Sequence, residues 1–232
     1  RDTQTLQVGL KNALRQAPGI EVVGGASDPF IARDLILRHE PDVITLDIET
    51  QNFFQDVGSN DPKDLDISIV CIHDSEDNTC KSFVVTDMRG LWPILENADA
   101  IVTWNGDHFD IPLLNKYYSG DLTKIRSIDL MKEVQAVLGR RLKLDSVASA
   151  TLGASKSSNG YQAVEWWKSG EIDKIIKYCT DDVMLTRKLY EHALTHGHLK
   201  FEDMGKLREL KLNTKTWETP VEKAALTFTL PF

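Results

Sequence analysis

The stretch DVITLDIET, residues 42–50, decides the fold that we predict for this chain. Residues 42–48 form a nearly continuous apolar run, which is typical of a strand buried inside a sheet. Asp47 and Glu49 stand at its end, and residues i and i+2 of a strand point to the same face. Two carboxylates on one face repel each other and are costly to desolvate, and a divalent cation between them would remove that cost. For an isolated pair, the alternative is that both side chains are solvated where the strand leaves the sheet.

Strands and helices alternate along the chain around this segment. Apolar spacing and turn residues predict further strands at residues 20–23, 67–72, 82–85, 99–103 and 125–128. They predict helices at residues 5–16, 28–39, 91–96, 109–118, 130–138, 144–151, 161–168 and 171–195. Residues 51–64 and 73–81 are predicted to be loops, the second of them a long hairpin loop, and no strong period follows residue 197. We therefore predict an α/β fold, a mixed sheet with three antiparallel strands and then parallel strands, flanked by helices.

Composition limits the class of protein. The chain has 232 residues, of which 41% are hydrophobic and 27% charged, a balance that excludes a wholly disordered chain. It contains no run of about 18 apolar residues, the length of a membrane helix. The net charge of −8 argues against coating nucleic acid by bulk charge, but not against an enzyme that meets phosphates through bound metal ions. Cys71, Cys80 and Cys179 are odd in number and lack CxxC spacing, so we expect no disulfide framework and a cytoplasmic location.

A second acidic segment, WNGDHFD at residues 104–110, follows the strand predicted at residues 99–103. Asn-Gly favours a turn, which leaves Asp110 in the first turn of the next helix. An aspartate there also complements the helix dipole, so a structural role explains this segment equally well. Asp107 is the second choice of carboxylate in this segment.

A third segment, YCTDD at residues 178–182, lies inside the long helix predicted at residues 171–195. Tyr178 and Asp182 are four residues apart and share one face of that helix. Asp181 is rotated by about 100° and is expected to face solvent. Taken alone, the pattern is also typical of a tyrosine and an acid on a helix surface.

Together, the three segments resemble the DEDD exonuclease superfamily, in the variant whose last motif carries tyrosine (DEDDy). The chain is similar to predicted prokaryotic 3′–5′ exonucleases with an RNase H-like fold. DIET, WNGDHFDIPLL and YCTDD resemble the three motifs in order, and RLKLDSVASATLGASKS and AVEWWKSG resemble family segments between the second and third. The resemblance covers about residues 42–200.

This resemblance implies a metal-dependent 3′–5′ exonuclease acting on single-stranded DNA or RNA 3′ ends by a two-metal-ion mechanism, with no membrane partner. The carboxylates of Asp47, Glu49, Asp110 and Asp182 would bind two Mg²⁺ or Mn²⁺ ions, hard cations that prefer oxygen ligands. Ions about 3.5–4 Å apart can stabilise both sides of an in-line displacement at phosphorus. Tyr178 would orient the attacking water, because an ordinary pKa of about 10 makes it a poor base at neutral pH.

The resemblance also implies weaker assignments. Thr50, Asn105 and Phe109 would contact the terminal nucleotide. A histidine replaces the tyrosine in the sister variant, but His192 and His196 do not have that variant's spacing to Asp182.

Residues 1–49 resemble a different family, part of a response-regulator receiver of the chemotaxis-methylesterase type. There Asp47 would be the phosphoacceptor, but the acidic pair of the first receiver strand and the later receiver strands and lysine are absent. The join at the DVITLDIE strand indicates a recombined or engineered chimera, or a gene fusion. We predict a receiver-like helix–strand–helix extension at residues 1–41, packed beside the exonuclease sheet, an exonuclease domain at residues 42–200 and a C-terminal tail at residues 201–232.

Two alternatives to the exonuclease remain open at this point. One is a nucleic-acid-binding module of the same fold that no longer cuts. The other is a truncated receiver phosphorylated on Asp47.

Overall fold

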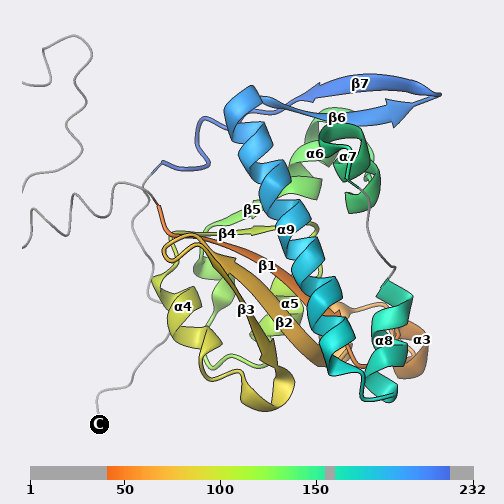
Figure 1. Ribbon diagram of the computed structural model, residues 1–232. Coiled ribbons are helices and arrows are strands. Elements are labelled where there is room, and N and C mark those ends of the chain that lie inside the picture. The colour runs from red at the N-terminus through yellow and green to blue at the C-terminus, as the bar shows by residue number, and fades with distance from the viewer. Residues whose placement is uncertain (1–40, 155–159, 220–232) are drawn as a thin grey trace, which may run out of the picture. The chain divides into compact units, whose positions relative to one another are not determined.

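The computed structural model describes residues 41–154 and 160–219 (Figure 1). The chain divides between Pro41 and Asp42, and all described residues after this boundary belong to one compact unit. The helices and the strand predicted within residues 5–39 lie outside the described residues.

A five-stranded mixed sheet forms the centre of this unit, in the order β3-β2-β1-β4-β5. Its strands are β1 (Val43–Thr50), β2 (Ile67–Asp74), β3 (Thr79–Val84), β4 (Ala100–Thr103) and β5 (Ser127–Asp129). β1, β2 and β3 pair antiparallel, whereas β4 is parallel to both β1 and β5. The predicted mixed α/β sheet is therefore confirmed, with β1 at its centre.

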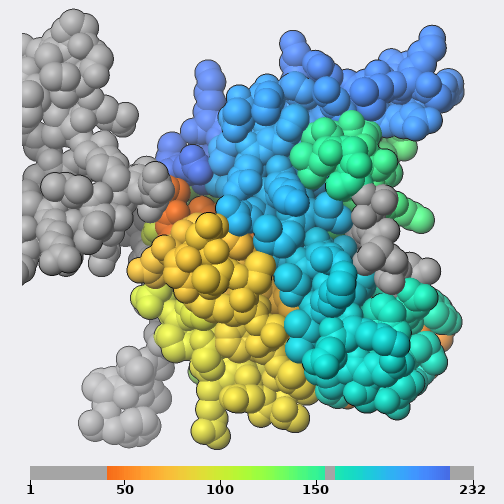
Figure 2. All heavy atoms as spheres, viewed as in Figure 1, coloured from red at the N-terminus to blue at the C-terminus, as the bar shows by residue number. Residues whose placement is uncertain are grey.

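Helices cover both faces of the sheet (Figure 1). The α-helices are α3 (Phe54–Val57), α4 (Leu91–Asn97), α5 (Asp110–Asn115), α6 (Leu130–Leu138), α7 (Leu144–Leu152), α8 (Gly160–Lys168) and α9 (Ile172–His196), and the short 3₁₀ turns are η1 (Pro62–Asp64), η2 (Val85–Asp87) and η3 (Leu122–Lys124). α4 and α5 share one hydrophobic core with the sheet, and α6, α7, α8 and α9 build the cores of the opposite face. Figure 2 shows α9 running across the front of this second face.

β1 carries apolar residues to one face and polar residues to the other. Ile44, Leu46 and Ile48 are buried in the core beneath α4 and α5. Because side chains alternate along a strand, Asp47 and Glu49 point to the opposite face, which α9 covers. The thiol of Cys179 on α9 reaches the side chain of Asp47, which confirms that orientation.

The predicted long hairpin loop between β2 and β3 is wrong. His73 pairs with Cys80 and Asp74 with Thr79, so the strands continue to a short turn at residues 75–78. Lys81 Nζ lies 2.6 Å from Asp74 Oδ2, so an ion pair draws this polar end of the hairpin together. The charged residues that indicated a loop belong instead to paired strands.

The segment after α9 is ordered, although no strong period predicted this. β6 (His198–Asp203) and β7 (Lys206–Lys211) form a two-stranded antiparallel sheet, and the predicted boundary between residues 200 and 201 falls inside β6. Leu199, Phe201 and Leu210 are buried with α6, α7 and α9. Further along, the ring of Trp217 stacks on Tyr190 of α9 with 5.5 Å between ring centroids.

Within residues 41–154 and 160–219, no helix has both the length and the apolar character needed to cross a membrane.

The contact of Trp217 predicts that this late segment stabilises the unit. Trp217 is 4% exposed, so we expect Trp217→Ala to lower the free energy of unfolding by about 3–5 kcal/mol through the cavity it leaves. Leu207→Ala is the matched control, because Leu207 is 62% exposed and its truncation should cost less than about 0.5 kcal/mol. Urea unfolding followed by circular dichroism measures both, and equal effects would contradict the packing of Trp217.

Gly106, just after β4, predicts a second stability effect. A Cβ added there would clash with the Oγ1, Cβ and Cγ2 atoms of Thr103, whose side chain is fully buried. We expect Gly106→Ala to destabilise the unit by about 1–3 kcal/mol. Gly160→Ala is the control, because no atom of the described residues lies within 4 Å of its added Cβ, and it should be neutral or stabilising by up to about 1 kcal/mol. Thermal unfolding of the two variants compares them directly.

Candidate active site

Four carboxylates from three elements are directed toward one region at the end of β1. Asp47 and Glu49 come from β1, Asp110 is the first residue of α5, and Asp182 lies in the middle of α9. Glu49, Asp110 and Asp182 are all buried, and Asp47 is partly buried. Buried acids without compensation are costly, so this arrangement needs a physical explanation.

Asp47 and Asp110 are close enough to influence each other's charge. Burial raises the pKa of Asp110 well above its ordinary value, and the neighbouring Asp47 carboxylate raises it further. A hydrogen bond from the backbone N–H of Ile48 opposes this rise. β1 therefore presents both a charge and a backbone donor to the carboxylate at the start of α5.

Tyr178 connects the acids of β1 with that of α9. Its hydroxyl is hydrogen-bonded to Asp182, one helical turn further along the same face. Burial raises the pKa of Tyr178 above its ordinary value, and the carboxylates of Asp182, Glu49 and Asp47 raise it further. The hydroxyl is therefore protonated at neutral pH. Trp166 of α8 fixes the ring from the other side by an edge contact with 6.2 Å between centroids.

Cys179 belongs to the same region, and the sequence analysis did not include it. Its Sγ lies 3.5 Å from Asp47 Oδ2, and ligand atoms of Asp47, Glu49 and Cys179 all lie within 4.8 Å of one another. Its spacing of three residues from Asp182 places both on one helix face, which is the signal that could have found it. Because burial raises the pKa of Cys179 well above its ordinary value, the group is a neutral thiol that donates weakly to Asp47.

The donor set fits divalent cations of the hard class. Carboxylate oxygens predominate over one neutral thiol, and Mg²⁺ and Mn²⁺ prefer oxygen ligands. The raised pKa of Asp110 points the same way, because a cation in this region would offset the repulsion from Asp47 that favours the protonated acid.

The loop that places Asp110 is held by Asp129 at the end of β5. The backbone N–H groups of Asn105 and Asp107 donate to the Asp129 carboxylate at 2.9 and 3.2 Å. The same carboxylate caps α6 by accepting from Met131 N at 3.0 Å. One structural acid therefore fixes both the loop before Asp110 and the helix after β5.

Asp107, the second choice of carboxylate in this segment, has different partners. Ser127 Oγ and Lys132 Nζ each lie 2.5 Å from its carboxylate. These contacts lower the pKa of Asp107 and direct its side chain toward β5 and α6. The loop therefore presents Asp110, and not Asp107, to the acids of β1.

The three residues expected to contact a nucleotide have distinct surroundings. Thr50 Oγ1 donates to the carbonyl of Asn52 at 2.9 Å. Asn105 has a left-handed backbone with φ of 76°, and its Oδ1 is buried without a hydrogen-bond partner among the described residues. Phe109 packs edge-on against Phe54 of α3, with 6.3 Å between ring centroids. Asn105 is thus the member of this set with a buried polar atom that lacks a hydrogen-bond partner among the described residues.

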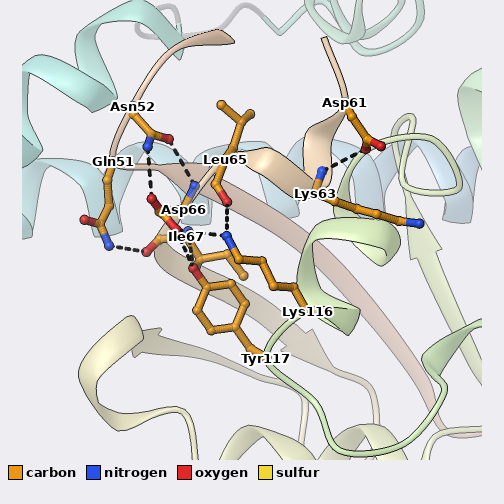
Figure 3. Close-up of polar contacts among 9 residues, drawn as sticks. All are labelled: Gln51, Asn52, Asp61, Lys63, Leu65, Asp66, Ile67, Lys116 and Tyr117. Atoms are coloured by element: carbon orange, nitrogen blue, oxygen red, sulfur yellow. Dashed lines mark hydrogen bonds and ion pairs between the residues drawn. The ribbon is translucent and has the colours of Figure 1, made fainter. Parts of the chain in front are cut away.

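A polar network ties the exit of β1 to the entry of β2 and the end of α5 (Figure 3). The Asn52 amide exchanges two hydrogen bonds with Asp66, through its Nδ2 with Asp66 Oδ2 and its Oδ1 with Asp66 N. Lys116 Nζ donates to the carbonyl of Leu65 at 2.8 Å and to Asp66 Oδ1 at 3.0 Å, and Tyr117 OH accepts from the N–H of Ile67. The hydrogen bond from Lys116 is the main cause of the lowered pKa of Asp66. This network holds α5, and therefore Asp110, against the strand that carries Asp47 and Glu49.

Comparison with curated proteins gives short matches of one kind. A protein-glutamate methylesterase/protein-glutamine glutaminase of Anaeromyxobacter dehalogenans is 56% identical over 48 residues, 21% of this chain and 14% of that protein. A namesake from Caulobacter vibrioides is 53% identical over 51 residues, 22% of this chain and 15% of that protein. These matches confirm the resemblance of residues 1–49 to part of a methylesterase, and the chain spans only about a seventh of such proteins.

Comparison with solved structures gives similar folds at low sequence identity. The family B DNA polymerase of the archaeon Pyrobaculum calidifontis matches with a TM-score of 0.52 and 21% identity, over 66% of this chain and 24% of the polymerase. The RNase D of Trypanosoma brucei matches with a TM-score of 0.48 and 17% identity, over 67% of this chain and 58% of that chain.

The family described as the RNase_H superfamily matches residues 44–194, which run from β1 to α9 and contain every residue of the acidic region described above. The order and direction of β1 to β5 are consistent with the RNase H-like fold expected from the three motifs. This chain therefore belongs to the RNase H superfamily.

Proposed function

We propose that this chain is a metal-dependent 3′–5′ exonuclease that hydrolyses phosphodiester bonds at the 3′ ends of single-stranded DNA or RNA. The proposal is supported by three sets of interactions at β1. Ligand atoms of Asp47, Glu49 and Cys179 lie within 4.8 Å of one another. Asp47 acts electrostatically on Asp110, and Tyr178 is hydrogen-bonded to Asp182 and acted on by Glu49 and Asp47. The four carboxylates would hold two Mg²⁺ or Mn²⁺ ions. When bound, such ions supply an activated water and stabilise charge on the leaving oxygen.

Tyr178 would act by orienting the attacking water. Its hydroxyl stays protonated because burial and three neighbouring carboxylates raise its pKa, so it does not serve as a base at neutral pH. The hydrogen bond to Asp182 and the edge contact with Trp166 fix the direction of that hydroxyl. Such fixed placement of a reacting group lowers the entropic part of the barrier.

Residues beside the acids would hold the terminal nucleotide. Asn105 Oδ1, which has no hydrogen-bond partner among the described residues, would accept a hydrogen bond from the sugar or the base. Thr50 of the first motif and Phe109 of the second would contact the same nucleotide. Just after Thr50, the ring of Phe53 stacks on Tyr161 with 4.3 Å between centroids, and Tyr161 is 66% exposed. Lys168 Nζ lies 5.2 Å from the Phe53 ring. An exposed aromatic ring beside a cation is the kind of surface on which single-stranded bases stack, which supports a single-stranded substrate.

The acids predict a sharp loss of activity on neutralisation. We expect Asp110→Asn and Asp182→Asn each to lower kcat by about a thousandfold, because metal-ion stabilisation worth several kcal/mol would be lost. Shortening of 5′-labelled single strands with Mg²⁺ or Mn²⁺ measures this. The matched control is Asp107→Asn, whose carboxylate binds Ser127 and Lys132, and it should keep activity within a few fold.

One stability control and three alternative outcomes complete that experiment. Asp110→Asn should not lower the unfolding temperature in the absence of metal, because it removes a repelling buried acid. Full activity in both Asp110→Asn and Asp182→Asn would refute the site. Retention of labelled strands by the wild-type chain without any shortening would favour a binding module. Transfer of label from acetyl phosphate to the wild-type chain, but not to Asp47→Asn, would favour the hypothesis of a phosphorylated receiver.

The Tyr178→Phe variant distinguishes a tyrosine that orients the attacking water from one that removes a proton from it. If Tyr178 orients the water, the variant should lose about a hundredfold in kcat with little change in KM, and its rate should follow the same pH dependence as the wild type up to about pH 9. A basic limb of the pH–rate profile that disappears with the hydroxyl would show instead that Tyr178 is the base.

A further inference from the structure

Three histidines gather where α9 meets β6, outside the acidic site. The sequence HALTHGH contributes His192, His196 and His198, half of the six histidines in the chain. The rings of His192 and His196 stack with 4.1 Å between centroids. The ring of His198 lies 5.4 Å from that of His192 and 6.1 Å from that of His196.

Local structure explains why these rings meet. His192 and His196 are four residues apart on one face of α9, a spacing used by helical metal sites. Gly197 then ends the helix in a left-handed conformation with φ of 71°, and its N–H donates to the carbonyl of Ala193. β6 begins at His198 directly after this turn, and the ring of His198 lies against that of His192 near the end of the helix.

Backbone carbonyls set the tautomer of two of these histidines. His196 Nδ1 lies 3.0 Å from the carbonyl of His192, and His198 Nδ1 lies 3.1 Å from the carbonyl of His196. A carbonyl only accepts, so both Nδ1 atoms carry the proton and the Nε2 atoms keep their lone pairs. Backbone carbonyls fix the tautomer of metal ligands in the same way. The Nε2 atoms of His192 and His198 are buried without a hydrogen-bond partner among the described residues.

Charges of both signs lie near the rings, and they would act on a bound cation in opposite directions. Glu209 Oε1 on β7 lies 3.6 Å from His198 Nε2, and the C-terminal end of α9 carries the negative end of the helix dipole. Lys200 lies close enough to His192 to act on it electrostatically, and its positive charge opposes a cation at the rings.

We propose that His192, His196 and His198, with the Glu209 carboxylate, form a second metal site that takes a transition metal such as Zn²⁺, Co²⁺ or Ni²⁺. Three imidazoles and one carboxylate give the four ligands that these borderline cations favour, unlike the oxygen-rich acidic site. In this structure the ligand atoms of these residues do not surround one common point, so metal binding would require the two stacked rings to turn about χ2, a torsion with a broad minimum.

The site is separate from the acidic region and does not depend on the proposed nuclease activity. His192 is ten residues beyond Asp182, which places it about 15 Å further along α9. An ion there would link α9 to the β6–β7 sheet, because its ligands come from both. Its expected consequence is stabilisation of the fold rather than turnover.

The test is metal binding to the purified chain in excess Mg²⁺, which occupies oxygen-rich sites. We expect one equivalent of Zn²⁺ by calorimetry, a rise in unfolding temperature, and with Co²⁺ a visible absorption band of four-coordinate nitrogen ligation. His196→Ala should weaken Zn²⁺ binding by at least about tenfold, because His196 would be a ligand, and Glu209→Gln should weaken it less.

The controls address the acidic site and surface residues. Asp110→Asn should keep the Zn²⁺ affinity, and so should His108→Ala and Glu202→Gln, which change exposed residues outside the cluster. The proposal would be overturned if Asp110→Asn no longer bound Zn²⁺ while His196→Ala still bound one equivalent. So would the absence of any Zn²⁺-dependent shift in the unfolding temperature of the wild-type chain.

Discussion

The repulsion among buried carboxylates is the constraint on which this architecture depends. Glu49, Asp110 and Asp182 are buried, and Asp47 lies beside them, so the unliganded protein must tolerate negative charge in a region of low dielectric constant. The raised pKa of Asp110 shows how it does so, because a protonated acid removes one of the charges. A bound cation would do the same while leaving the acid ionised. The fold is therefore built around charges that a ligand can balance.

Rigid neighbours hold these acids together against their repulsion. The Asp129 carboxylate accepts hydrogen bonds from the backbone of the Asn105 loop and of the first turn of α6. Asp66 forms hydrogen bonds that link β1, β2 and the end of α5. The two acids that build the scaffold are satisfied by N–H donors or by a lysine. The acids of the candidate site have hydrogen-bond donors as well, such as the Ile48 N–H for Asp110 and the Tyr178 hydroxyl for Asp182. They differ from the scaffold acids because they also lie near other carboxylates, and this proximity distinguishes functional candidates from structural carboxylates.

The sequence predicted those features that depend on local spacing. Residues 130–138 form α6 as predicted, because Asp129 caps the helix and Gly139 ends it in a left-handed conformation. The alternation of β1 likewise fixed the shared face of Asp47 and Glu49. The β6–β7 hairpin escaped prediction because Leu207 and Leu210 of β7 are three residues apart, which breaks the strand period of two, and because its Met204-Gly205 turn is a weak signal. The approach of Cys179 to Asp47 depends on how α9 packs across the sheet, which no local spacing encodes.

α9 is the element through which these observations are connected. It carries Tyr178, Cys179 and Asp182 against β1 in its first half, and the histidines against β6 at its end. Its middle is buried against the sheet through Val183, Leu185 and Leu189, so the two ends of the helix share one rigid body. A change that tilts α9 would move Asp182 and Tyr178 relative to β1. An ion held between the histidines and Glu209 would resist that tilt from the far end, because it would tie the last turn of the helix to a separate sheet. Stability at one end of the helix and geometry at the other would then be physically linked.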